Sequence, residues 1–134
     1  MADDDPMLEV GRAIRPYLGD LLSDPASAAA ADADFAALLA EARQGRPVEG
    51  AIRARLEADP DLHRWAAAFL QHGAPPEIVN ELERSGDAPP GDVGASPALD
   101  VFACPEGDYV WWRRAVGMAV PACPTHEIPL ERRP

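Results

Sequence analysis

Helix start and stop signals recur through the first 84 residues and restrict this part of the chain to short helices. An aspartate followed by proline, the pair that caps a helix and begins it, occurs three times: Asp5-Pro6, Asp24-Pro25 and Asp59-Pro60. Apolar residues follow each pair at three- and four-residue spacing, and glycines close the patterns. Pro16 should split the first helix. We expect a bundle of four or five short helices over residues 1–84.

The composition agrees with a helical core. The chain has 134 residues, enough for one modest hydrophobic core. Aromatic residues make up only 6% of it, and alanine is abundant. Such a core is built from aliphatic side chains on helices rather than from the faces of a β-sandwich.

The pattern changes after the helices. Residues 85–98 are rich in Gly, Pro, Asp and Ala, which predicts a linker. Residues 99–134 contain short apolar runs at 100–104, 108–115 and 119–121. They predict a small β-hairpin or meander, so the fold class is mainly α with a small β-ribbon. A piece of this size needs a metal, or docking on the helices, to be stable.

Charge excludes several classes of function. The net charge is −11, and all 12 basic residues are arginines. Without lysine there is no Schiff-base chemistry and no P-loop. The acidic excess argues against a protein that follows nucleic-acid phosphates. It is concentrated in residues 1–98, with a net charge of −10, against −1 in residues 99–134.

The location of the protein is predicted from two features of the chain. The N-terminus is acidic where a signal peptide would be basic. No apolar run approaches the ~18 residues of a membrane span. We expect a cytoplasmic protein, in which cysteines are more often thiols or metal ligands than disulfides.

Two Cys-Pro turns form the strongest chemical motif. Cys123 and His126 stand in a Cys-x-x-His spacing that suits one metal ion, and Cys104 begins the other turn. The fourth ligand is open between Asp108, Glu127 and water. A carboxylate would close a structural zinc site, and water would give a catalytic one. The third alternative is that no metal binds and aromatic side chains hold the hairpin.

The residues around these turns carry a family resemblance. The stretches 104–114 and 120–126 resemble the C-terminal module of small actinobacterial and cyanobacterial accessory proteins, and more loosely a degenerate zinc ribbon. Those proteins accompany signalling or defence ATPases, proteases and von Willebrand A-type partners. The resemblance covers about a quarter of the chain, and it implies an accessory role rather than catalysis.

An aromatic and basic run follows the first Cys-Pro turn. In a strand, Tyr109, Trp111 and Arg113 share one face, while Trp112 and Arg114 share the other. An exposed aromatic side chain beside arginine is typical of protein interfaces. The alternative is that both tryptophans belong to the core. Stacking on nucleic-acid bases is disfavoured by the net charge.

The remaining candidates are weak. His63 and His72 are nine residues apart on one predicted helix, which is not a metal spacing. Cys123 and His126 suit an ion better than the proton transfer that a cysteine hydrolase requires. We therefore expect a non-enzymatic adaptor that binds a larger bacterial signalling or defence protein. A zinc-dependent hydrolase and a nucleic-acid-binding regulator are the alternatives.

Overall fold

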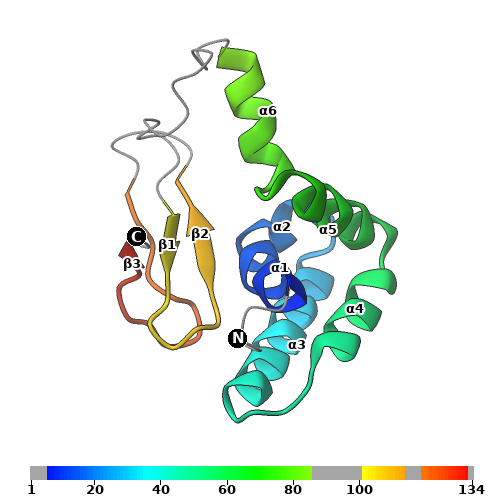
Figure 1. Ribbon diagram of the computed structural model, residues 1–134, viewed down its shortest axis with the longest axis vertical. Coiled ribbons are helices and arrows are strands. Elements are labelled where there is room, and N and C mark those ends of the chain that lie inside the picture. Colours follow the sequence, from blue (N-terminus) through cyan, green and yellow to red (C-terminus); the bar gives the residue numbers. More distant parts are fainter. Residues whose placement is uncertain (1–5, 86–100, 114–118, 133–134) are drawn as a thin grey trace.

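The helical part of the protein is built as its sequence predicts. The computed structural model describes residues 6–85, 101–113 and 119–132, and residues 6–85 form successive short helices (Figure 1). Their bounds are α1 (Pro6–Ile14), the 3-10 turn η2 (Arg15–Tyr17), α2 (Leu18–Leu21), α3 (Pro25–Arg43), α4 (Glu49–Glu57), α5 (Pro60–His72) and α6 (Pro76–Ser85).

Local signals explain where these helices begin and end. The carboxylate of Asp24 accepts a hydrogen bond from the main-chain N–H of Ser27 at 3.2 Å, so it caps α3. Gly73 ends α5 in the left-handed conformation, with a φ of 72°. Pro16 lies in η2, and the expected break of the first helix falls at this turn.

One apolar core joins the first helices. Helix α1 lies in the centre, with α3, α4 and α5 packed around it (Figure 1). Phe35 of α3 and Ile52 of α4 are fully buried in this core, and Trp65 stacks on Phe69 with ring centroids 5.4 Å apart. Helix α6 extends beyond α5, and its Ile78 is buried.

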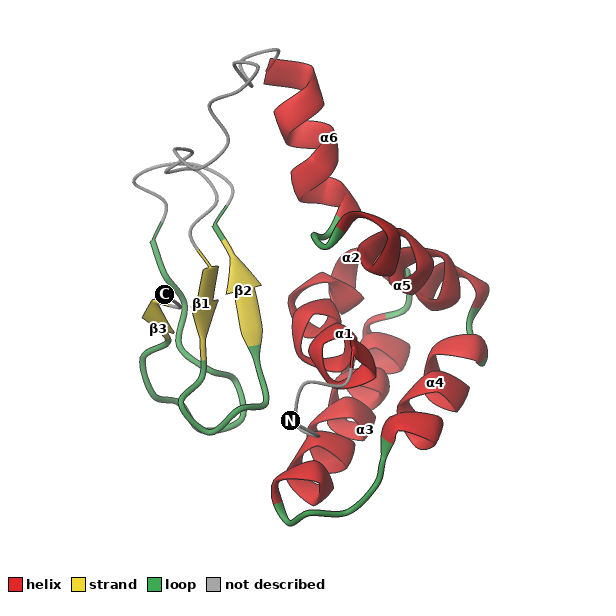
Figure 2. Cartoon of the chain, viewed as in Figure 1, coloured by secondary structure: helices red, strands yellow, loops and turns green. Residues whose placement is uncertain are grey.

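Three short antiparallel strands form the second part (Figure 2). They are β1 (Val101–Ala103), β2 (Val110–Trp112) and β3 (Glu131–Arg132), in the order β2-β1-β3. Ala103 pairs with Val110 on one side and with Glu131 on the other. The predicted fold class, a helical bundle followed by a small sheet, is confirmed.

The prediction of a third strand at residues 119–121 is wrong, and so is the meander order. These residues lead into the second Cys-Pro turn, and Pro121 has no N–H to donate to a neighbouring strand. Ala122 instead forms an isolated bridge with Pro129 across that turn. The turn reverses the chain, so β3 pairs with the free edge of β1.

The sheet lies against the helices through β2, which contacts α1 and η2 (Figure 2). Val110 in β2 is fully buried. The predicted linker, residues 85–98, lies outside the described residues apart from Ser85 at the end of α6. Within the described ranges, every helix is too short or too polar to cross a membrane.

Candidate metal centre

Four potential metal ligands converge at the end of the sheet. The two thiols of Cys104 and Cys123, a carboxylate oxygen of Asp108 and a ring nitrogen of His126 all lie within 4.8 Å of one another. The first three residues are buried, and the His126 side chain is 30% exposed. This ligand cluster could hold a metal ion.

Two turns of the same design carry the ligands. In the first turn (Cys104–Tyr109), the N–H of Cys104 donates to the carbonyl oxygen of Tyr109 at 2.9 Å. In the second turn (Cys123–Ile128), the N–H of Cys123 donates to the carbonyl oxygen of Ile128, also at 2.9 Å. Each turn therefore spans six residues and begins with its cysteine.

Left-handed residues explain why the two turns place their second ligand differently. Gly107, with a φ of 83°, precedes Asp108, whereas Glu127, with a φ of 56°, follows His126. The second ligand consequently stands four residues after Cys104 but three residues after Cys123. The side chain of Glu127 is exposed and is not part of the ligand cluster. Of the three alternatives for the fourth ligand, the structure brings Asp108 to the site.

The distances from His126 to the two sulfurs match the edges of a zinc tetrahedron. With ordinary zinc bond lengths, a sulfur and a nitrogen ligand lie about 3.6 Å apart, sulfur and oxygen about 3.6 Å, and nitrogen and oxygen about 3.4 Å. His126 Nδ1 lies 3.6 Å from Cys104 Sγ and 3.7 Å from Cys123 Sγ. Cys123 Sγ is 3.5 Å from Asp108 Oδ1, and His126 Nδ1 is 3.4 Å from Asp108 Oδ2. The imidazole and the two sulfurs therefore stand at the spacing of zinc ligands, and each carboxylate oxygen of Asp108 lies at such a spacing from one of these donors.

Burial controls the protonation of the first cysteine. Desolvation raises the pKa of the Cys104 thiol to about 11, against a hydrogen bond from the N–H of Glu106 that lowers it. This N–H lies 3.4 Å from the sulfur. The nearby Cys123 and Asp108 raise the pKa of Cys104 further. A metal that binds the thiolate therefore has to displace the thiol proton.

A buried arginine of the helical part contacts both turns. Arg15 Nη1 donates to the main-chain oxygen of Asp108 at 2.6 Å, and Nη2 donates to Thr125 Oγ1 at 2.7 Å. Its guanidinium also lies over the ring of Tyr109, 5.2 Å from the ring centroid. Asp32 accepts from Arg15 Nε at 2.6 Å and forms an ion pair with it. Burial raises the pKa of Tyr109 to about 12, so its phenol is neutral beneath this cation.

Two further arginines bind the first turn. Arg12 Nε donates to the carbonyl oxygen of Gly107 at 2.7 Å, and Arg43 forms an ion pair with Glu106. Sequence reasoning missed these contacts. One signal was available for Arg15, since it stands three residues before Leu18 on an otherwise apolar face.

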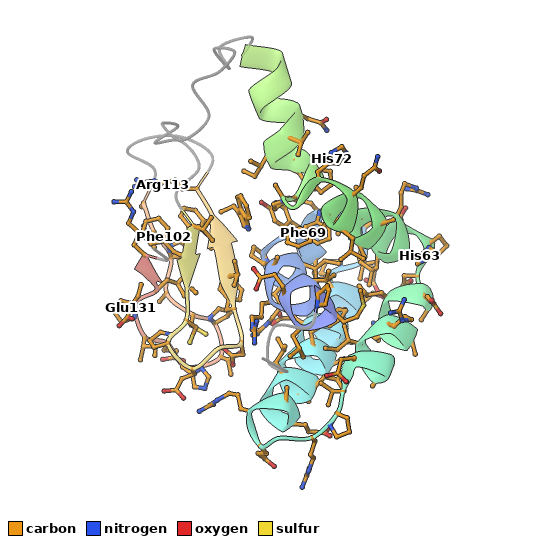
Figure 3. The ribbon with its side chains drawn as sticks, viewed as in Figure 1. His63, Phe69, His72, Phe102, Arg113 and Glu131 are labelled. Atoms are coloured by element: carbon orange, nitrogen blue, oxygen red, sulfur yellow. The ribbon has the colours of Figure 1, made fainter. Side chains whose placement is uncertain are left out.

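The predicted interaction residues separate to different places. On the outer face of the sheet, Trp111 lies against Phe102 with ring centroids 6.0 Å apart, and Arg113 lies over the ring of Phe102 at 5.3 Å (Figure 3). Tyr109 is buried. Trp112 lines a cleft of about 460 Å³ that faces the helices. Arg114 lies outside the described residues.

The two other histidines are distant from the ligand cluster. His63 and His72 are both exposed on α5, as expected for surface histidines (Figure 3). Neither belongs to a group of potential ligands within the described parts of the chain.

Comparison with known proteins gives no relative from which a function could be transferred. No protein-family model, no characterised protein and no solved structure matches the chain significantly.

Proposed function

We propose that the protein is a non-enzymatic adaptor whose small sheet is held in shape by one structural zinc ion. The observation that carries this proposal is the convergence of four buried or half-buried donors within 4.8 Å of one another, with His126 at the zinc-ligand spacing from both sulfurs. Two thiolates with one imidazole and one carboxylate suit zinc better than magnesium or calcium, which prefer oxygen ligands.

The same ligand set favours a structural role over a hydrolytic one. A catalytic zinc keeps an open position for water, whereas Asp108 supplies a fourth protein ligand here. With all four positions taken, the ion has no water to activate. The ligand set therefore disfavours the zinc-dependent hydrolase, and the net charge of −11 disfavours the nucleic-acid-binding regulator.

The contact surface that we assign is the outer aromatic face, formed by Phe102, Trp111 and Arg113. Aromatic rings in contact beside a guanidinium are typical of the residues that dominate protein–protein binding. This face belongs to the nearly neutral end of the chain, away from most of the acidic charge. The family resemblance of the Cys-Pro turns favours a larger bacterial signalling or defence protein as the partner, in the cytoplasm.

The adaptor role is tested with the double variant Trp111→Ala/Arg113→Ala. We expect it to lose a partner that the unaltered protein captures from cell extract, while its helical circular dichroism is unchanged. The matched control is Leu70→Ala/Arg64→Ala on α5, which removes one apolar residue and one arginine from the exposed surface of the helices.

The captured partner is then purified and its binding is reconstituted with both variants. A partner that binds the double variant as tightly as the unaltered protein contradicts the assignment of this face. Binding that is lost only in the control places the contact on the helices instead.

A further inference from the structure

We propose that Arg15 positions the carboxylate ligand of the metal centre, so that the helical part sets the metal affinity of the sheet. This inference rests on the proposed zinc site and adds to it a residue from outside the ligand cluster. Arg15 is separated from Asp108 by 93 positions in the sequence, yet it contacts the main chain of this ligand.

Arg15 fixes one ligand in each turn. Its bond to the main-chain oxygen of Asp108, at 2.6 Å, holds the backbone from which the carboxylate projects. Its bond to Thr125 Oγ1, at 2.7 Å, holds the residue that precedes His126. A single guanidinium therefore holds the two turns at a fixed spacing, as the outer hydrogen bonds of metal sites do for their ligands.

The guanidinium is itself held rigidly. Asp32 accepts from Nε at 2.6 Å and from Nη2 at 3.2 Å, and the Arg15 side chain is only 1% exposed. This pattern uses three nitrogens of one planar group in fixed directions. A lysine ammonium at the same place would be a point charge without this fork.

Charge gives Arg15 a second effect on the metal. A divalent ion with two thiolates and one carboxylate leaves a net charge of −1 in a buried site. The Arg15 guanidinium lies 4.0 Å from Asp108 Oδ2 and compensates this charge, which is costly to bury alone. The side chain of Asp32 is 35% exposed, so water compensates part of the Asp32 charge. Part of the positive charge of Arg15 therefore remains to act on the metal site.

The test is zinc affinity of the full chain, measured by competition with a chromophoric chelator. We expect Arg15→Gln and Arg15→Lys to weaken zinc binding by about 10- to 100-fold, the range found for partners of metal ligands. Arg55→Gln is the matched control, because Arg55 also pairs with two carboxylates, those of Asp34 and Asp59. It should change the affinity by less than about twofold.

A milder variant covers the case in which the Arg15 variants do not fold. Thr125 is exposed, and Thr125→Val removes only its hydrogen bond to Arg15. We expect zinc binding about fivefold weaker, in line with the loss of one hydrogen bond.

Two readouts separate positioning from general stability. Arg15→Gln should shift the visible absorption of the Co²⁺-loaded protein, because a displaced Asp108 changes the coordination, whereas Arg55→Gln should not. In a chain that carries Asp108→Ala, adding Arg15→Gln should still cost about the fivefold expected from the lost Thr125 hydrogen bond, but less than it costs when the Asp108 carboxylate is present. The two changes would then be non-additive, as expected for residues that act together.

Each outcome decides between the two proposals. If the unaltered chain binds no zinc, both the structural zinc site and the role of Arg15 are overturned. If it binds zinc and the Arg15 and Thr125 variants bind equally well, the role of Arg15 alone is overturned. The role of Arg15 is also overturned if Arg15→Gln weakens zinc binding as much in the Asp108→Ala chain as in the chain with Asp108, because Arg15 then acts without the Asp108 carboxylate.

Discussion

Different forces stabilise the helical part and the small sheet. Among the described residues, seventeen that are buried form the core of the helical part, whereas the buried cluster of the sheet has four members: Cys104, Tyr109, Cys123 and Leu130. Two of those four are potential metal ligands. Burial of apolar surface can stabilise the helices, but it is too limited in the sheet to do the same. The arginine contacts supply part of the rest, and in our proposal a bound metal supplies the remainder.

Polar contacts join the helical part to the first turn of the sheet. Arg12, Arg15 and Arg43 all bind the first turn, where they meet two carbonyl oxygens and one carboxylate. Hydrogen bonds of this kind depend on the exact shape of the turn. We therefore expect the shape of the metal site and the docking of the sheet to change together.

Metal removal should give the largest difference between the two parts, because it should destabilise the sheet and leave the helices nearly unchanged. With the zinc-loaded protein treated with a strong chelator, amide hydrogen exchange in residues 101–132 should speed up by at least about 100-fold, because structural zinc sites supply much of the folding free energy of small domains. The amides of α3 and α4 should change little. Equal protection of the sheet with and without metal would contradict the distinction between the two parts.

A cavity in the helical core should have the opposite effect. Phe35 is fully buried, so Phe35→Ala should lower the free energy of unfolding by about 3–5 kcal/mol. Urea unfolding followed by far-ultraviolet circular dichroism measures this loss. Gln71→Ala, at an exposed position of α5, is the control and should cost less than about 0.5 kcal/mol. A loss for Phe35→Ala as small as that of the control would contradict the assigned core.

Backbone strain in the first turn gives a smaller effect on the sheet. Gly107 has a φ of 83°, and a Cβ there would meet no atom within 4 Å. Gly107→Ala should therefore cost only the left-handed strain of about 1–2 kcal/mol, seen as zinc binding weakened about 5- to 30-fold. Glu127→Gly, at a φ of 56° in the second turn, should strengthen binding instead. The same direction of change in both variants would contradict this reading of the turns.

The smallest effect should come from the cap of α3, and it should depend on pH. The side-chain hydrogen bond from Ser27 lowers the pKa of Asp24 from its ordinary value of 3.8. Because the folded pKa is the lower one, the capping contribution is fully present above about pH 4 and is lost as the pH falls through the folded pKa. Asp24→Ala should slightly lower the midpoint of helical unfolding at neutral pH. It should have no effect below the folded pKa of Asp24, where the carboxylate of the unaltered protein is protonated.

Asp24→Asn separates capping from charge. Asparagine also caps helices, so this variant should keep the midpoint near that of the unaltered protein at neutral pH without the acid dependence of the cap. Zinc affinity should be the same in both Asp24 variants. A change in zinc affinity would mean that the two parts are coupled beyond the arginine contacts.

Local signals made the helices predictable. Asp24 before a proline and Gly73 at the end of a helix act within a few residues, and the structure uses both as expected. The order of the strands was harder to predict from the sequence. It depends on how the second Cys-Pro turn reverses the chain, and Pro121 alone gave only a hint that residues 119–121 are not a paired strand.

The ligand cluster was partly predictable from spacing. Cys123 and His126 lie in one turn, and Asp108 was one of three choices for the fourth ligand because it follows Cys104 by four positions. The left-handed φ of Gly107, which brings Asp108 into the site, is a property of the folded turn. Arg15 was missed because its contacts join positions 93 and 110 residues apart.

The metal content of the protein tests the central claim most directly. The chain is purified without a metal-binding tag, beside Cys123→Ser, and zinc is measured by elemental analysis and native mass spectrometry. The account predicts about one zinc per chain in the unaltered protein and none retained in the variant. A folded protein that stays free of metal when zinc is supplied would contradict it.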